Sequence, residues 1–240
     1  MCDQIIARDT VDRIISDIID VQKSDLTKDG IYYEHSESNM LNGYALIYGP
    51  SDTPYSYGHF LFKLNFPFNY PYQPPEVVYL TNDGSTRFHP NYYKDGNVCL
   101  SFLNTWKGEQ WTSCGTIKSV LLVLCSLLDE MPLLNEPGIS KHHKDHKPYN
   151  RIIEYKTLEV AINKIVNKEL LPKDFYIFYD IIVENFIKNY DDIYNKYIEL
   201  EKKFDDCILT TSCYSLKVRC KYNNSIELLK KEYIKLQKLK

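Results

Sequence analysis

The chain has 240 residues, of which 44% are hydrophobic and 25% charged, and its formal net charge is -3. This composition is typical of a soluble globular protein with one main domain, and it gives no electrostatic reason to expect a nucleic-acid partner. The longest apolar run, residues 120–128, is less than half as long as a membrane span, and the N-terminus lacks the apolar core of a secretory signal. We therefore expect no membrane association and a cytoplasmic and/or nuclear location.

The chain contains seven cysteines, which is an odd number, and none of them forms a CxxC pair. They stand at positions 2, 99, 114, 125, 207, 213 and 220. Scattered cysteines of this kind are typical of reduced thiols rather than of disulfides or a zinc module.

The first predicted element is an amphipathic helix over residues 8–24. Apolar side chains recur there at helical spacing, at Val11, Ile14, Ile15, Ile18 and Ile19. We expect this helix to pack through one face only.

After Gly30 the pattern changes to short segments rich in β-branched and aromatic residues. Strands are predicted over residues 31–36, 42–49, 58–66 and 76–81. The third segment alternates, with Phe60, Phe62, Leu64 and Phe66 on one face and His59, Lys63 and Asn65 on the other. Short links between consecutive strands favour an antiparallel meander whose apolar face is covered by helices, which is an α+β fold.

The second half of the chain is predicted to be helical. Residues 116–130 form a core helix that we expect to be buried on nearly all sides, and a helix near 158–166 should end before Pro172. Two further apolar stripes, over 175–190 and 226–236, predict a helical C-terminal extension. We therefore divide the chain into a core domain, residues 1–170, and an extension, residues 171–240.

The stretch HPNYYKDGNVCLSF, residues 89–102, is the chemically most informative part of the sequence. A lone cysteine such as Cys99 is usually a buried apolar residue. Here, however, Pro90 and Gly96 constrain the chain around it, and Asn91 precedes it by eight residues. A side-chain amide held near a thiol can stabilise the oxyanion of an acyl transfer. The residues alone thus indicate a constrained polar loop beside a thiol.

Several motifs extend this observation. They are YGPSDTPYSYGHF before the third strand, YPYQPPEV after it, HPN at 89–91, GNVCLS at 96–101 and a tryptophan at 111. In this order and spacing, residues from about 5 to 170 resemble the ubiquitin-conjugating enzyme (E2) family. The longer stretch CLSFLNTWKGEQW and the later NEPG, 135–138, resemble the large Z-type branch of that family. The resemblance implies a UBC-like fold followed by a helical C-terminal extension.

The same resemblance implies a mechanism without metal or organic cofactor. Cys99 would receive ubiquitin from an activating enzyme as a thioester and pass it to a substrate lysine or to a ligase. Asn91 would serve either as oxyanion donor or as a brace of its loop, and both interpretations stand. For His89 the resemblance favours a bracing role over that of a general base. Glu136 would help an incoming lysine to lose its proton, unless it is only a solvated loop residue.

Partner-binding residues also follow from the resemblance. Tyr72 in the proline-rich loop and Ser113 match positions where the family meets ligases, although Thr-Ser-Cys replaces the usual Ser-Pro-Ala at 112–114. Arg8 and Arg13 on the first helix would face the activating enzyme. Because acidic residues are interspersed with them, a mixed solvated face is the alternative.

The sequence leaves alternatives to this interpretation. The cargo could be a ubiquitin-like modifier, or the chain could be a non-catalytic scaffold that binds ubiquitin or a ligase. A cysteine hydrolase would need an oriented histidine base, for which the sequence has no local signature. His142 and His146 would suit a metal only on a helix, whereas the flanking Gly138 and Pro148 predict a solvated loop. Trp106 and Trp111 are expected to be packing anchors.

Overall fold

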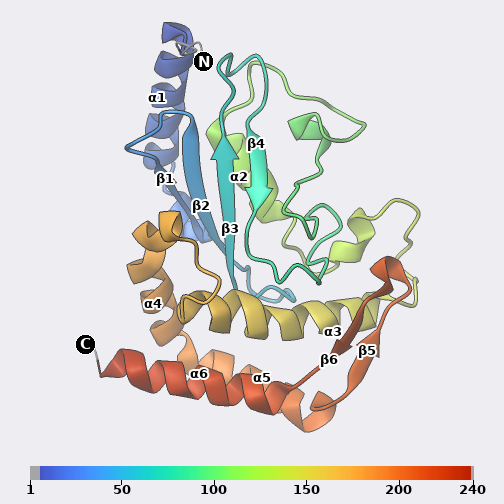
Figure 1. Cartoon of the computed structure of the whole chain (residues 1–240). Helices are drawn as coiled ribbons and strands as arrows, with labels where there is room; N and C mark the ends of the chain where they lie inside the picture. Colours follow the sequence, from blue (N-terminus) through green and yellow to red (C-terminus); the bar gives the residue numbers. More distant parts are fainter. Residues whose placement is uncertain (1–5, 239–240) are drawn as a thin grey trace.

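A four-stranded antiparallel sheet lies at the centre of the computed structural model, which describes residues 6–238 (Figure 1). Its strands follow one another in the order of the chain. They are β1 (Ile31–His35), β2 (Asn42–Tyr48), β3 (His59–Asn65) and β4 (Glu76–Tyr79). The predicted strands and their meander are thus confirmed.

One face of the sheet packs against the main hydrophobic core. Phe60, Phe62 and Leu64 of β3 are fully buried there, as their alternation predicts. The helices α1 (Arg8–Lys23) and α2 (Ile117–Ser126) contribute to the same core. The expectation that α2 is buried on nearly all sides is wrong, because Leu122 is 41% exposed. The neighbouring elements cover only part of its circumference.

The opposite face of the sheet is also covered, which the sequence pattern of β3 did not indicate. Tyr44, Leu46 and Leu61 point into a second cluster of buried residues, which includes Phe175 and Phe178 of the extension. His59 is fully buried as well, and burial lowers the pKa of its imidazole to about 4. Both faces of the sheet are therefore apolar interfaces.

Helix α3 (His146–Lys156) joins the two clusters. It continues as a π-helical stretch, Thr157–Lys164, so the helix expected near 158–166 begins twelve residues earlier. Ile152 and Ile153 belong to the main core, whereas Tyr155 and Leu158 belong to the second cluster. One continuous helix thus holds the sheet and the extension together.

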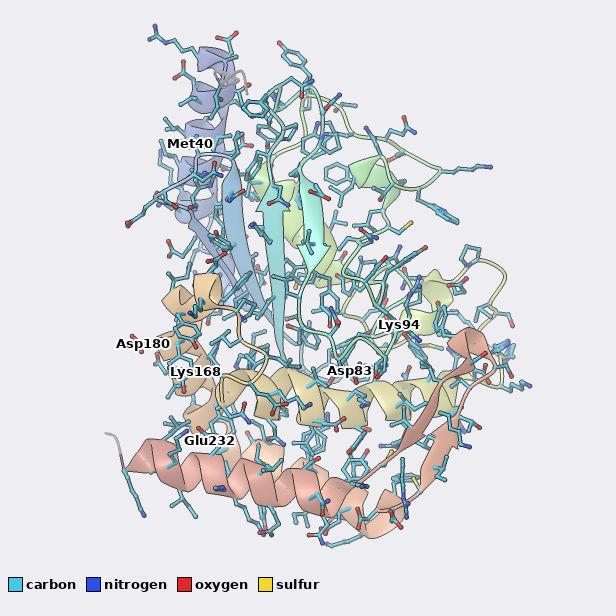
Figure 2. All side chains as sticks on the ribbon, viewed as in Figure 1. Met40, Asp83, Lys94, Lys168, Asp180 and Glu232 are labelled. Carbon is cyan, nitrogen blue, oxygen red and sulfur yellow. The ribbon has the colours of Figure 1, made fainter. Side chains whose placement is uncertain are left out.

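An ion pair fixes α3 below the sheet. Lys156 Nζ lies 2.9 Å from Asp83 Oδ2, and Figure 2 places Asp83 directly beside this helix. Although burial disfavours the charge on Asp83, Lys156 and the backbone amides of Thr86 and Ser85 lower the pKa of the carboxyl well below its usual range. Both side chains are largely buried, and Lys156 also pairs with Glu159 at 2.6 Å, so the charge of Asp83 depends on Lys156.

The C-terminal extension is helical, as predicted, with one addition. Its helices are η5 (Lys173–Phe178), α4 (Tyr179–Lys188), α5 (Tyr190–Phe204) and α6 (Tyr222–Gln237). A short hairpin of β5 (Ile208–Thr210) and β6 (Lys217–Arg219) interrupts them and was not predicted, because strands of three residues are too short to display a period. Short 3₁₀ turns complete the fold: η1 (Leu26–Asp29), η2 (Ser101–Leu103), η3 (Pro132–Asn135) and η6 (Cys213–Ser215). The division at residue 170 stays a prediction.

Within residues 6–238, no helix combines the length and the apolar character needed to cross a membrane. The six cysteines that the structure describes are all free thiols, in agreement with the sequence, while Cys2 lies outside the described residues.

Adjacent residues of the extension provide a test of its packing. Phe178 is 1% exposed in the second cluster, whereas Ile177 is 54% exposed. Replacement Phe178→Ala should lower the free energy of unfolding by about 3–5 kcal/mol, because it removes a buried aromatic ring and leaves a cavity. Ile177→Ala should change it by less than about 0.5 kcal/mol. Urea titrations of both variants make the measurement, and equal losses would contradict the shared core.

Candidate active site

Cys99 lies at the end of a segment that continues the sheet. Asn97 forms a bridge with Val78 of β4, and the amide of Tyr79 donates to the carbonyl of Gly96 at 2.8 Å. Gly96 has φ +91°, and a Cβ there would lie 3.0 Å from the Tyr79 carbonyl oxygen, so only glycine fits this turn. The thiol that follows is half-buried at the surface rather than sealed in the core.

The thiol of Cys99 is held by the loop that follows it. Sγ donates to the carbonyl of Thr105 at 3.3 Å. The hydroxyl of Thr105 accepts from the Leu100 amide at 2.7 Å and so closes the loop on itself. Thr105 was not singled out from the sequence, because a threonine six residues away from a cysteine carries no distinctive signal.

Asn91 makes two hydrogen bonds with Cys99. Its carbonyl accepts from the Cys99 amide at 2.9 Å, and its side-chain Nδ2 donates to the Cys99 carbonyl at 2.6 Å. Asn91 Oδ1 is buried and has no hydrogen-bond partner among the described residues. In this state the asparagine braces the loop, and the second N–H of its amide makes no hydrogen bond among the described residues.

His89 is fully buried behind Asn91. Its Nδ1 accepts from the Asn91 amide at 3.0 Å, and its Nε2 lies 3.4 Å from Nδ2 of Asn135. Burial, with a smaller contribution from the charge of Arg87, lowers the pKa of His89 to about 3. The imidazole is therefore neutral near pH 7 and both nitrogens have neighbours, which supports the bracing role over that of a general base.

Glu136 follows the 3₁₀ turn η3, one residue after Asn135. Its carboxylate is not simply solvated, because Oε2 accepts a hydrogen bond from the phenol of Tyr214. Tyr214 belongs to the tip of the β5–β6 hairpin, 78 residues further along the chain. No pattern in the sequence indicates this contact.

A groove of about 620 Å³ opens beside Cys99. Its walls come from the proline-rich segment 73–77 and from the loop 103–106. Trp106 lines the groove and is 53% exposed, so the expectation that it is a packing anchor is wrong, because the loop that carries it projects from the core. Trp111 fits the expectation: it is 7% exposed, and its Nε1 donates to the Pro71 carbonyl at 2.7 Å. An extended peptide chain could reach the sulfur through this groove.

Comparisons with known proteins agree with this geometry. The chain is 37% identical to ubiquitin-conjugating enzyme E2 Z of Xenopus tropicalis over 180 residues, which is 70% of this chain and 57% of the relative. It is 38% identical to ubiquitin-conjugating enzyme E2 Z of Homo sapiens, over 70% of this chain and 50% of that protein. A Plasmodium yoelii protein solved as a candidate ubiquitin conjugating enzyme superposes with a TM-score of 0.53, at 25% identity, over 65% of this chain and 97% of its own.

The sequence model of the family described as "Ubiquitin-conjugating enzyme" matches residues 13–157, which is more than half of the chain. The chain belongs to the ubiquitin-conjugating enzyme family. Its sheet, helices and C-terminal helical part form the UBC fold that the sequence predicts. The chain spans about half the length of the curated relatives that it matches.

The expected ligase-binding residues of this E2 lie on two loops that are tied together. Tyr72 is 75% exposed on the proline-rich loop, and Ser113 is exposed on the loop after Trp111. The Trp111–Pro71 hydrogen bond joins the two loops, and Thr10 of α1 donates to the carbonyl of Tyr70 at 2.9 Å. The two side chains are therefore presented from one supported surface.

The two arginines expected to meet the activating enzyme differ in their surroundings. The side chain of Arg8 is 92% exposed and lies 3.7 Å from Asp12. Arg13 is 23% exposed, and its guanidinium donates to Asp17 and to the Ser113 carbonyl, both at 2.8 Å. Arg13 thus fastens α1 to the loop of Ser113, and only Arg8 offers an exposed charge to a partner.

The histidine-rich segment does not form the helical metal pair that was considered. His142 lies in a turn, and the helix begins only at His146, whose Nε2 lies 2.8 Å from the Ser140 carbonyl. Possible ligand atoms of His143, Asp145 and Cys213 do lie within 4.8 Å of one another. These groups already bond with each other, since Asp145 accepts from the Cys213 amide at 2.7 Å and its own amide donates to His143 Nδ1 at 3.2 Å. We assign them to fold contacts rather than to a metal.

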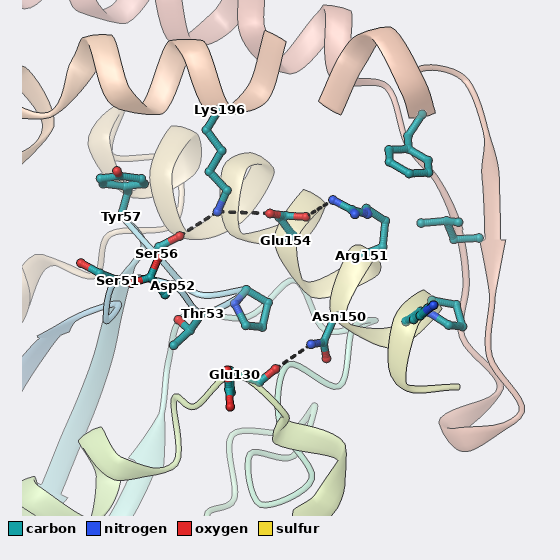
Figure 3. A pocket seen from close by; sticks show the side chains of 15 residues that line it. Ser51, Asp52, Thr53, Ser56, Tyr57, Glu130, Asn150, Arg151, Glu154 and Lys196 are labelled. Carbon is teal, nitrogen blue, oxygen red and sulfur yellow. Dashed lines mark hydrogen bonds and ion pairs between the residues drawn. The ribbon is translucent and has the colours of Figure 1, made fainter. Parts of the chain in front are cut away.

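A larger cavity, of about 960 Å³, lies between the core and the extension (Figure 3). Lys196 reaches into it from α5, donating to Ser56 Oγ at 2.7 Å and lying 3.3 Å from Glu154. Glu154 also pairs with Arg151. Because burial dominates, the pKa of Lys196 is lowered in spite of Glu154. The cavity shares no lining residue with the groove of Cys99, and its acidic and basic lining residues are equal in number.

The buried His89 makes the stability depend on pH. In the unfolded chain the imidazole takes up a proton near pH 6.5, whereas in the folded chain it stays neutral down to about pH 3. Above pH 6.5 the imidazole is neutral in both states. As the pH falls below 6.5 only the unfolded chain takes up the proton, so the free energy of unfolding decreases. In His89→Asn, whose amide oxygen can still accept from the Asn91 amide, the loss of unfolding free energy between pH 7 and pH 5 should shrink by about 2 kcal/mol.

Urea titrations at the two pH values provide the measurement. His59, the other fully buried histidine, stays in both proteins, so its own pH dependence cancels in the comparison. An unchanged pH dependence in the variant would show that His89 is protonated in the folded protein.

Proposed function

We propose that the chain accepts ubiquitin from an activating enzyme as a thioester on Cys99 and transfers it to a substrate lysine or to a ligase. The observation that carries the proposal is the half-buried thiol at the edge of an open groove, with the side-chain amide of Asn91 bound to the carbonyl of the same cysteine. Family membership supports the same reaction.

Loading requires only the thiol and its surroundings. The thiolate of Cys99 attacks the thioester carbonyl, a tetrahedral oxyanion forms, and the cysteine of the activating enzyme leaves. A thiol is ionised to a few per cent near neutral pH and its thiolate is strongly nucleophilic, so the step needs neither a base nor a cofactor. The hydrogen bond from Sγ to the Thr105 carbonyl must break as the proton leaves. Before the loaded activating enzyme binds, this bond holds the thiol in place.

Transfer to lysine makes greater demands on the site. An ammonium group must lose a proton before it can attack, and the oxyanion that then forms needs a donor. The remaining N–H of Asn91 is the candidate donor, and the carboxylate of Glu136 is the candidate acceptor of the proton. His89 supports this arrangement from behind by fixing the Asn91 amide.

The proposed partners follow from the same interpretation. Arg8 would contact the activating enzyme, and the surface of Tyr72 and Ser113 would contact a ligase. Ubiquitin and protein substrates would meet at Cys99, in the cytoplasm and/or nucleus. A ubiquitin-like modifier is the alternative cargo. A non-catalytic scaffold is disfavoured because Cys99 is present together with the motif residues around it. A hydrolase is disfavoured because the nearby His89 is buried and its Nδ1 already accepts a hydrogen bond.

The thioester is directly testable. Incubation with activating enzyme, ATP and ubiquitin should give an adduct that reductant removes, and Cys99→Ala should abolish it. The matched control is Cys114→Ala, which removes an exposed free thiol on another loop and should load normally. A reductant-sensitive adduct that persists in Cys99→Ala would sink the assignment. Repeating the assay with ubiquitin-like modifiers and their activating enzymes identifies the cargo.

The role of Asn91 can be tested by comparing the loading of Cys99 with the discharge of its thioester to lysine. In Asn91→Ala, discharge of the thioester to free lysine should slow by about 100-fold, the usual effect of losing one oxyanion donor, while loading slows by less than about tenfold. Single-turnover discharge of preformed thioester is the measurement, with unfolding by urea as the control for loop damage. If both half-reactions slow equally, the asparagine only braces its loop.

A further inference from the structure

The tip of the β5–β6 hairpin reaches the surroundings of the candidate active site. Figure 1 shows the hairpin passing the start of α3 towards the loop of residues 130–145. The tip, residues 211–216, carries Tyr214, whose phenol donates to Glu136. The extension therefore contributes a side chain to the loop that the proposed chemistry uses.

The tip is fastened on both sides of Tyr214. The amide of Cys213 donates to Asp145 at 2.7 Å, the hydroxyl of Thr211 donates to the Cys213 carbonyl at 2.7 Å, and Leu216 is buried in the main core. Tyr214 has φ +60° and Ser215 has φ +49°, a left-handed conformation that such residues rarely adopt. Contacts on either side hold the tip in this conformation, which aims the phenol at the core domain.

Tyr214 also covers the arginine that supports the loop of residues 89–91. The Cζ atom of Arg87 lies 5.0 Å from the ring centroid of Tyr214 and 3.4 Å from that of Tyr93. From this position Arg87 Nε donates to the His89 carbonyl at 3.3 Å, and a terminal nitrogen donates to the Pro90 carbonyl at 2.5 Å. The ring of Tyr214 therefore lies against one loop of the site while its hydroxyl holds the other.

The phenol stays a donor over the whole working range of pH. Burial and the charge of Glu136 raise the pKa of Tyr214 well above its ordinary value. A protonated phenol beside a carboxylate donates to it, so the hydrogen bond fixes one oxygen of Glu136.

We infer that Tyr214 is a positioning residue for attack by the amine: its hydroxyl holds the carboxylate of Glu136 in the orientation that takes the proton from the incoming lysine. This inference rests on the proposed function. The lysine ammonium gives one proton to Glu136, and the free amine forms a C–N bond with the thioester carbonyl. The C–S bond then breaks, a second proton passes from nitrogen to the departing sulfur of Cys99, and Glu136 returns its proton to water.

The test compares Tyr214→Phe, Glu136→Gln and the double variant. Tyr214→Phe keeps the ring over Arg87 and removes only the hydroxyl. Loading by the activating enzyme should stay within about twofold of the unmodified chain, while the maximal rate of discharge to lysine falls roughly tenfold at an unchanged KM for lysine. Tyr176→Phe, at a 45% exposed tyrosine of the same extension, should leave both rates unchanged.

The double variant shows whether Tyr214 acts through Glu136. If it does, Tyr214→Phe has no further effect once Glu136→Gln is present. An unchanged discharge rate in Tyr214→Phe, or independent losses that multiply in the double variant, would overturn the inference. Failure of the unmodified chain to load would instead sink the proposed function, so the two failures are distinguishable.

Discussion

The pair of hydrogen bonds between Asn91 and Cys99 is the constraint on which the site depends. Both peptide groups of the cysteine are used, its amide by the Asn91 carbonyl and its carbonyl by the Asn91 side chain. The backbone of the cysteine is therefore held in place, and its Sγ donates to the Thr105 carbonyl at 3.3 Å. Its half-exposed position is imposed by its neighbours, and the burial of His89 behind them makes the arrangement rigid.

Rigidity at the sulfur is possible because a stiff scaffold lies behind each loop. The segment of Cys99 extends β4, and the loop of His89 is held by Arg87 and by the hydroxyl of Tyr149, which donates to the Arg87 carbonyl at 2.8 Å. The groove beside the sulfur is left open by contrast. Its exposed Trp106 contributes apolar surface next to the reacting atom without being fixed by the core.

The sequence predicted those features that leave a pattern among neighbouring residues. Alternation in β3 and helical spacing in α1 and α6 located those elements, and the eight residues from Asn91 to Cys99 located the site. Contacts across long separations leave no such pattern. Tyr214 meets Glu136 across 78 residues, and Leu61 faces the extension although its neighbours on the same strand predicted a single apolar face. Trp106 is exposed and not a packing anchor, and residue type alone does not show that its loop projects from the core.

The C-terminal extension packs against the sheet and against α3. Tyr44, Leu46 and Leu61 of the sheet share a buried cluster with it, and so does Tyr155 of α3. The buried ion pair of Lys156 with Asp83 ties the last residue of that helix to the loop after β4. Because α3 also carries Tyr149, which supports Arg87, the extension stabilises the very helix on which the loop of His89 and Asn91 depends. Loss of packing in the extension would thus reach the cysteine through one continuous helix.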